Sequence, residues 1–224
     1  MARGANDGFW HWPGVASLAY AYLVIGAPMF VAFASIYAGA DYLTGLHDYR
    51  TPLYLSFELA IPFVPATAVL YNSLHLAYAM APFVLRTRRQ THALAIVWLL
   101  MTLVAGIVFL AFPFEHGFPR PSPAELGVWA DLYRLADQAN LRFNSCPSLH
   151  VAWGVCCVDV YSRFAGRRGR WLLAAWGCGM TASTVLLHQH HLIDVAGGLA
   201  LAFWGSRWLF PRLCDRRADD QADD

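Results

Sequence analysis

Two polar clusters interrupt the apolar second half of the chain, and each contains a histidine beside groups that could assist it. The first is the segment 144–150, which reads Asn-Ser-Cys-Pro-Ser-Leu-His and ends at His150. The second begins at Ser183 and continues to His190 and Asp194. A histidine supported by a carboxylate can act as a nucleophile, because the acid holds its tautomer and stabilises its cation. The two clusters therefore predict covalent catalysis by a histidine.

In the second cluster the spacing places the imidazole and the carboxylate close together. His190 and Asp194 are four residues apart, so on a helix they would share one face within contact range. Asp194 also lies inside an apolar run, where an ionisable side chain is costly and marks a functional position by default. We expect His190 to be the nucleophile and Asp194 to support it.

The first cluster has the features of a helix start. Pro147 suits the first turn of a helix, and Ser145 or Cys146 suits its cap. The unpaired N–H groups and the dipole of a helix N-terminus favour an anion. His150 is then expected about one turn into the helix, beside an anion site.

The composition of the chain predicts that these clusters are held by membrane-spanning helices. Of the 224 residues, 58% are hydrophobic and 14% are charged, a balance too apolar for an ordinary soluble domain. All 16 basic residues are Arg, and the net charge of +1 gives no bias toward nucleic acid. The five cysteines show no metal-site spacing. We expect one transmembrane domain over residues 1–224, with its catalytic part at about 113–210 and no cleaved signal peptide.

Apolar stretches of suitable length predict about six membrane-spanning helices. The expected spans are 15–38, 53–85, 93–112, 147–164, 171–187 and 192–210. The second is longer than one span and contains Pro62 and Pro65, which favours a kinked or tilted helix preceded by a short segment. The insertion 113–146 is expected to carry a surface helix within 123–141. The predicted fold is an all-α polytopic membrane bundle with an extracytoplasmic loop and helix between spans three and four.

Basic residues predict the orientation of this bundle. With six spans, the Arg clusters at 86–89, 167–170 and 212–217 fall on one side of the membrane. Cytoplasmic loops carry an excess of basic residues, so both termini are expected to be cytoplasmic. We therefore expect an integral protein of the bacterial inner (cell) membrane whose two polar clusters face the extracytoplasmic side.

Three segments of the second half, taken in order, resemble the motifs of the type 2 phosphatidic acid phosphatase superfamily. The motif Lys-(six residues)-Arg-Pro corresponds to 113–121, and Pro-Ser-Gly-His corresponds to 147–150. The motif Ser-Arg-(five residues)-His-(three residues)-Asp matches the spacing of 183–194 throughout. The resemblance implies that His190 attacks phosphorus to form a phosphohistidine and that His150 protonates the leaving oxygen. It also implies that no metal or other cofactor is needed.

This sequence departs from the family pattern at two cations. Pro113 replaces the Lys of the first motif and Thr184 replaces the Arg of the third, which leaves Arg120 as the matched cation. The expected phosphate-binding residues are Arg120, Ser148, Ser183 and, as a substitute cation eight residues before His150, Arg142. Weaker substitutes are Arg134, His116, His188 and His191.

The resemblance is strongest to the inositol phosphorylceramide synthase-like branch. Leu149 stands in place of the Gly of the second motif and Thr184 in place of the Arg of the third, and both changes are similar to that branch. It implies an enzyme acting on a lipid-linked phosphate, with water as acceptor in a phosphatase and an alcohol in a phosphotransferase. One alternative is transfer of phosphoinositol or another headgroup onto a lipid alcohol. Alternatives of other classes are a haem-binding electron carrier, suggested by nine histidines, and a non-catalytic transporter.

Three polar residues lie in the long second apolar region. Packing is the favoured interpretation for Asn72 and His75, since polar groups in spans usually face the bundle. Glu58 could instead line the entry route of the substrate.

Overall fold

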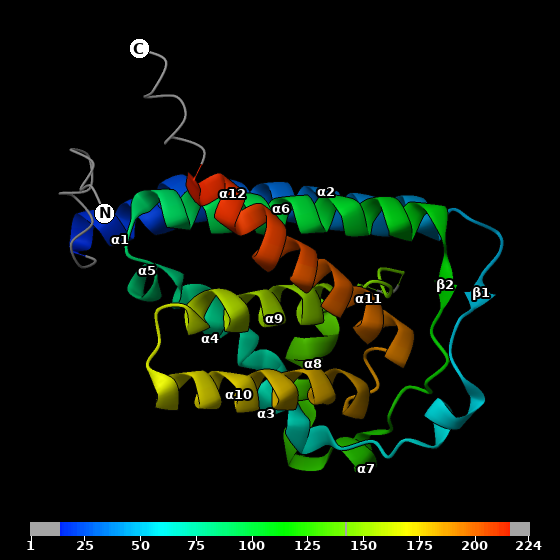
Figure 1. The fold of residues 1–224 in the computed structure, drawn as a ribbon. Helices are drawn as coiled ribbons and strands as arrows, with labels where there is room; N and C mark the ends of the chain where they lie inside the picture. The colour runs from blue at the N-terminus through cyan, green and yellow to red at the C-terminus, as the bar shows by residue number, and fades with distance from the viewer. Residues whose placement is uncertain (1–13, 142, 216–224) are drawn as a thin grey trace.

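The computed structural model describes residues 14–141 and 143–215. The chain is mostly helical, at 76%, with almost no strand. Figure 1 shows long helices lying side by side, with several short helices among them and two very short strands at one end of the bundle. The predicted all-α class is therefore confirmed.

The N-terminal helix is continuous from Val15 to Gly45 and lies along α6 (Arg88–Ala111). Its three stretches are α1 (Val15–Ala19), the π-helical η2 (Tyr20–Gly26) and α2 (Ala27–Gly45). Both helices are long and apolar enough to cross a membrane, and they correspond to the first and third expected spans. A capping box between Thr87 and Gln90 fixes the start of α6.

Between these helices, region 53–85 forms short helical pieces. They are η3 (Ser56–Ala60), η4 (Pro65–Thr67), α3 (Ala68–Asn72), α4 (Leu74–Ala79) and α5 (Ala81–Val84). Pro62, Pro65 and Pro82 lack the N–H that an unbroken helix requires, which accounts for the breaks near them. The expected short leading segment is present, but the kinked helix after it is divided into three. The number of spans stays a prediction.

The insertion 113–146 carries the helix expected within 123–141, but in divided form. Its pieces are α7 (Pro123–Leu126), η5 (Gly127–Trp129) and α8 (Ala130–Ala139), of which α8 packs against α3. The division falls at Gly127, whose φ of +50° suits glycine. Before α7, strand β2 (Phe114–Glu115) pairs in parallel with β1 (Thr51–Pro52).

The C-terminal part is a three-helix unit with α9 packed between its neighbours. It consists of α9 (Leu149–Ser162), α10 (Arg167–Leu186) and a continuous helix made of α11 (Leu192–Phe203), η6 (Trp204–Leu209) and α12 (Phe210–Asp215). Gly198 permits close approach of α11 to the start of α9, because a Cβ there would lie 2.6 Å from the Ser148 carbonyl oxygen. The unit therefore has tightly fixed ends at the two polar clusters.

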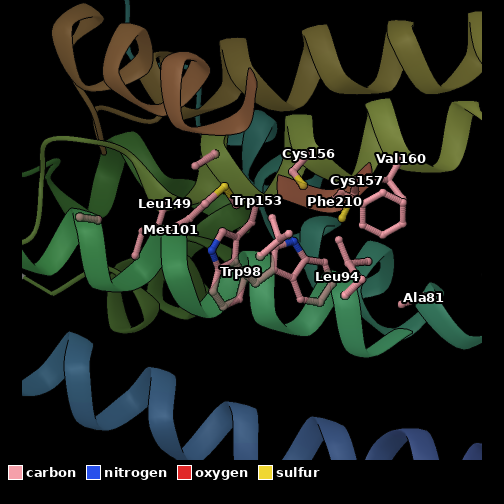
Figure 2. Packing of buried hydrophobic residues seen from close by; sticks show 14 of the residues in the cluster. Ala81, Leu94, Trp98, Met101, Leu149, Trp153, Cys156, Cys157, Val160 and Phe210 are labelled. Atoms are coloured by element: carbon pink, nitrogen blue, oxygen red, sulfur yellow. The ribbon is translucent and has the colours of Figure 1, made fainter. Parts of the chain in front are cut away.

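The main apolar core joins α6 to α9. Trp98 and Trp153 stack at its centre, with ring centroids 5.3 Å apart and planes 15° apart. Figure 2 shows Cys156 and Cys157 among the surrounding apolar side chains, where they act as small apolar side chains of the core. This packing holds α9, which carries His150, against the long helix α6.

The described Arg residues of the basic clusters gather at one end of the bundle. The Arg86 guanidinium lies 5.6 Å from the ring centroid of Phe164, and Arg89 Nε donates to the Leu213 carbonyl at 3.1 Å. The β1–β2 pair and the α10–α11 connection lie at the opposite end (Figure 1). This is the expected separation of basic residues from the polar clusters. Arg216 and Arg217 lie outside the described residues.

Candidate active site

His190 lies in the short connection between α10 and α11 and is 1% exposed. The backbone N–H of His190 donates to the Thr184 carbonyl, which folds the connection back onto the end of α10. Its Nδ1 is 3.4 Å from Asp194 Oδ2, while its Nε2 is buried without a hydrogen-bond partner among the described residues. With the Nδ1 proton directed at the carboxylate, the Nε2 lone pair is left for a reaction.

The contact between His190 and Asp194 was predicted, but its geometry differs from the expected shared helix face. Asp194 is in the first turn of α11, whereas His190 precedes the helix and its N-cap residue His191. Asp194 Oδ2 also accepts the His191 backbone N–H at 2.8 Å, as in a capping box. The carboxylate therefore closes the start of the helix and holds the histidine that comes before it.

His150 lies next to His190, with ring centroids 6.4 Å apart. It is the second residue of α9, because the helix begins at Leu149 with Ser148 as its N-cap. The expected start at Pro147 and the expected depth of one turn are thus wrong: the Ser148 hydroxyl accepts the Val151 N–H and takes the capping role. The two histidines nevertheless meet at one end of the bundle.

A tyrosine from a distant segment holds His150 in place. The Tyr71 hydroxyl is 3.1 Å from His150 Nδ1, and the two rings stack with centroids 4.1 Å apart. Tyr71 is completely buried. Since Nδ1 is engaged by this hydroxyl, Nε2 is the nitrogen of His150 that can exchange a proton with a ligand.

The next residue, His191, is bound through both ring nitrogens. Its Nε2 accepts the Gly117 N–H at 3.0 Å, so Nδ1 carries the proton and donates to Glu58 Oε2 at 3.1 Å. Glu58 also accepts the backbone N–H groups of Leu55 and Leu192, each at 2.9 Å. The carboxylate thus joins η3 to the start of α11.

The charge states of this buried pair follow from its surroundings. Glu58 accepts hydrogen bonds from the backbone N–H groups of Leu55 and Leu192 and from His191 Nδ1, and such donors favour the ionised carboxylate. Burial lowers the pKa of His191, against the opposing effect of Asp194 and Glu58. A neutral His191 therefore donates to an ionised Glu58.

The structure places the two predicted serines within the protein interior. Both Ser148 and Ser183 are fully buried. The Ser183 hydroxyl donates to the Met180 carbonyl at 2.6 Å, and the Ser148 N–H donates to the Asp194 carbonyl at 3.0 Å. Ser148 therefore ties the two clusters together, while the Ser183 hydroxyl already has a partner inside α10.

The two described Arg candidates, Arg120 and Arg134, are exposed. Arg120 is exposed in the segment before α7, and Arg134 pairs with Asp131 on the exposed side of α8. Arg142 lies outside the described residues. Their roles at the phosphate stay predictions.

The weaker histidine candidates are part of an aromatic layer. The His188 Nε2–H donates to the Ile61 carbonyl at 2.9 Å, and the Phe118 ring lies between those of His188 and His191, at 4.1 and 4.3 Å. His188 adopts φ of +55°, a backbone conformation rare outside glycine. His116 lies at the exposed edge of this layer, 5.4 Å from the ring of His191. The layer covers the α10–α11 connection.

An apolar cavity of about 710 Å³ lies on another side of His150. Its walls come from the N-terminal helix, α4, α5, α6 and the first turns of α9. Volumes of this order are typical of small-molecule sites. His150 thus lies beside both the second histidine and an apolar cavity.

Two supporting residues were not recognised from the sequence as partners of the histidines. Tyr71 lies in a mostly apolar region and gave no signal of its own. Glu58 was assigned from the sequence to the entry route of the substrate, whereas the structure buries it against His191 and Leu192. Asn72 acts in packing as predicted, because its Nδ2 donates to the carbonyls of Ala68 and Leu132.

Across residues 14–141 and 143–215, no three His, Cys, Asp or Glu side chains are grouped so that they could hold a metal ion. The side chains brought together at the site are instead two imidazoles, a carboxylate and a phenol. Such a set is suited to nucleophilic attack and proton transfer.

Comparison with known proteins gives a family for this arrangement. The family model described as the PAP2 superfamily matches residues 48–208, which include both polar clusters, Glu58 and Tyr71. Neither the curated proteins nor the solved structures gave a match.

Proposed function

The chain belongs to the PAP2 superfamily, and we propose that it is a membrane phosphatase or phosphotransferase that acts on a lipid-linked phosphate through a phosphohistidine at His190. The observation that carries this proposal is the asymmetry of the His190 ring. Its Nδ1 faces Asp194, and its buried Nε2 has no partner within the described part of the chain. A nucleophile needs such a free lone pair, together with a base-orienting group.

The proposed reaction has two displacements at phosphorus. In the first, His190 Nε2 forms the N–P bond while the P–O bond to the lipid breaks and His150 gives its proton to the leaving oxygen. In the second, the oxygen of water or an alcohol attacks phosphorus, His150 takes its proton, and the N–P bond breaks. Asp194 stabilises the positive charge on His190 while the phosphoryl group is attached.

Arg120 is the proposed cation for the phosphate oxygens, with Arg142 as its helper and Ser148 and Ser183 as further members of the site. Arg120 is the cation that matches the motif, and Arg142 is proposed to replace charge that the motif positions Pro113 and Thr184 lack. A guanidinium can bind two phosphate oxygens at once, so one or two Arg residues form a sufficient clamp.

We further propose that the protein lies in a bacterial inner membrane with the site at the extracytoplasmic face. Two long apolar helices and the basic residues at the opposite end of the bundle support this orientation. We also propose that the chain belongs to the inositol phosphorylceramide synthase-like branch. The support is Leu149 in place of the motif Gly and Thr184 in place of the motif Arg. Headgroup transfer to a lipid alcohol is the corresponding activity.

The decisive experiment uses purified protein in detergent with EDTA and a panel of lipid phosphates labelled at phosphorus. Wild type should release phosphate and, after acid-free quenching, carry label on His190. His190→Ala should lose both signals, whereas phosphate release by His190→Ala at the wild-type rate would exclude this nucleophile. Addition of candidate lipid alcohols distinguishes the acceptors, because a new labelled phospholipid identifies a transferase.

The same preparation tests the other classes. A haem carrier would show a Soret absorption band, and a non-catalytic transporter would bind lipid phosphate without forming a phosphoenzyme. Membership of the PAP2 superfamily favours the enzyme.

A further inference from the structure

The cavity beside His150 has walls that suit a hydrocarbon chain. Its lining is mostly aromatic and aliphatic, its polar members are Thr91, His75 and His150, and no Asp, Glu, Lys or Arg occurs among the described residues that form it. The residues nearest the catalytic end include Phe33, Trp153 and His150. The described lining therefore offers an anionic headgroup no permanently charged cation, whereas an apolar chain would lose contact with water at little electrostatic cost.

The position of the cavity relative to the two histidines decides which part of a substrate it could take. Attacking and leaving atoms lie roughly in line in phosphoryl transfer. If His190 attacks, the leaving oxygen is on the far side of phosphorus, where His150 protonates it. The cavity is lined by His150 but not by His190 or Asp194, so it lies on the leaving-group side.

We propose that this cavity binds the hydrocarbon chain of the leaving lipid alcohol, and that the N-terminal helix is the wall that sets which chain fits. This inference rests on the proposed function, because it assigns the leaving group through the roles of His190 and His150. The family match begins at residue 48, so the wall formed by Val15–Gly45 is outside it. Chain selection would then be a property of this protein in addition to its family chemistry.

The N-terminal helix is bonded to the segment just before α9. A helix that determines which hydrocarbon chain fits must keep a fixed position relative to His150. Asn144 Nδ2 donates to the Tyr37 carbonyl at 2.7 Å, and the Phe143 N–H donates to Asp41 Oδ1 at 2.8 Å. Both bonds join α2 to the residues just before α9. The distance between α2 and His150 is therefore held by polar contacts.

A further hydrogen bond joins this helix to α4 at the cavity. The Tyr22 hydroxyl donates to the Ala79 carbonyl at 2.6 Å, and both residues line the cavity. The small side chains of Ala27 and Ala95 also line the cavity. Larger side chains at these positions should shorten the chain that fits.

The experiment uses the full-length protein and a long-chain alkyl phosphate that carries a photoreactive diazirine near the end of its chain. Ala95→Phe fills the cavity from α6, and Ala27→Phe fills it from α2. The matched controls are Ile96→Phe and Val31→Phe, whose side chains are 43% and 64% exposed on the same helices and do not line the cavity. Two filling variants on different helices guard against a folding defect in one of them.

Wild type and both controls should be labelled within residues 21–33 or 79–82, and both filling variants should lose most of that label. In a parallel assay of phosphate release, the filling variants should lose kcat/KM for long alkyl phosphates and retain it for short ones. Equal labelling of all five proteins, or label only on other surfaces, would overturn the inference.

The two readouts separate this inference from the proposed function. If wild type is labelled in the cavity but releases phosphate from no substrate, the cavity binds the chain and the proposed reaction is wrong. If wild type releases phosphate but filling leaves both the labelling and the chain-length profile unchanged, the reaction stands and the cavity assignment is wrong.

Discussion

His190 and His191 are neighbours in sequence and are both buried, yet their ring nitrogens have different partners. One ring nitrogen of His190 faces Asp194 and the other has no partner in the described chain. Both ring nitrogens of His191 are occupied, by Glu58 and by the Gly117 N–H. The comparison teaches that burial and residue type alone do not distinguish two histidines, whereas an unsatisfied lone pair beside a carboxylate supports the nucleophilic role proposed for His190.

The strongest test of this contrast changes Asp194, the carboxylate that faces His190. Asp194→Asn should reduce kcat for phosphate release by on the order of 10² to 10⁴, because an amide cannot stabilise the imidazolium charge as a carboxylate does. KM should change much less, since Asp194 does not contact the lipid chain in the proposed arrangement. Steady-state kinetics would check this, and a wild-type kcat would contradict the role given to Asp194.

The corresponding change on the His191 side should affect stability first. Glu58→Gln places an N–H donor against the donors that Glu58 now accepts, at a cost of about 1–3 kcal/mol in the free energy of unfolding. Chemical denaturation in detergent would measure it, with the exposed Glu115→Gln as the control. An unfolding free energy equal to that of the control would show that the Glu58–His191 pair is not structural.

A smaller effect is expected at His150, whose proposed role differs from those of His190 and His191. Tyr71→Phe keeps the stacked ring but removes the hydroxyl on His150 Nδ1, so kcat should fall by up to about tenfold. If His150 is the acid, the loss should be large for alkyl leaving groups and small for a nitrophenyl phosphate, which needs no protonation. Equal losses for both leaving groups would argue against that role.

The smallest expected effect concerns pH. Because the pKa of His191 is lowered in the folded protein, the unfolded chain binds more protons just below pH 6.5, and stability should fall as the pH is lowered through this window. His191→Asn retains a donor for Glu58 but cannot titrate. Its melting temperature should therefore change less between pH 7 and 5 than that of wild type, and identical slopes would contradict the assignment.

The sequence allowed prediction of those features that depend on local spacing. Composition predicted a helical chain, and the four-residue interval brought His190 to Asp194, although through a helix cap and not a shared face. Contacts between distant segments could not be predicted in this way. Tyr71 is 79 residues from His150, and Glu58 is 133 residues from His191. Such pairs depend on how helices pack, which no local periodicity specifies.

The close approach at Gly198 affects how the site can open. With a Ser148–Asp194 backbone bond and no room for even a methyl group between α9 and α11, the two helices should move as one rigid body. His150 and Asp194 would then keep their separation throughout the catalytic cycle. Since His190 Nε2 is buried, we expect substrate entry to displace α3 or the segment around Phe118, and that displacement could limit turnover.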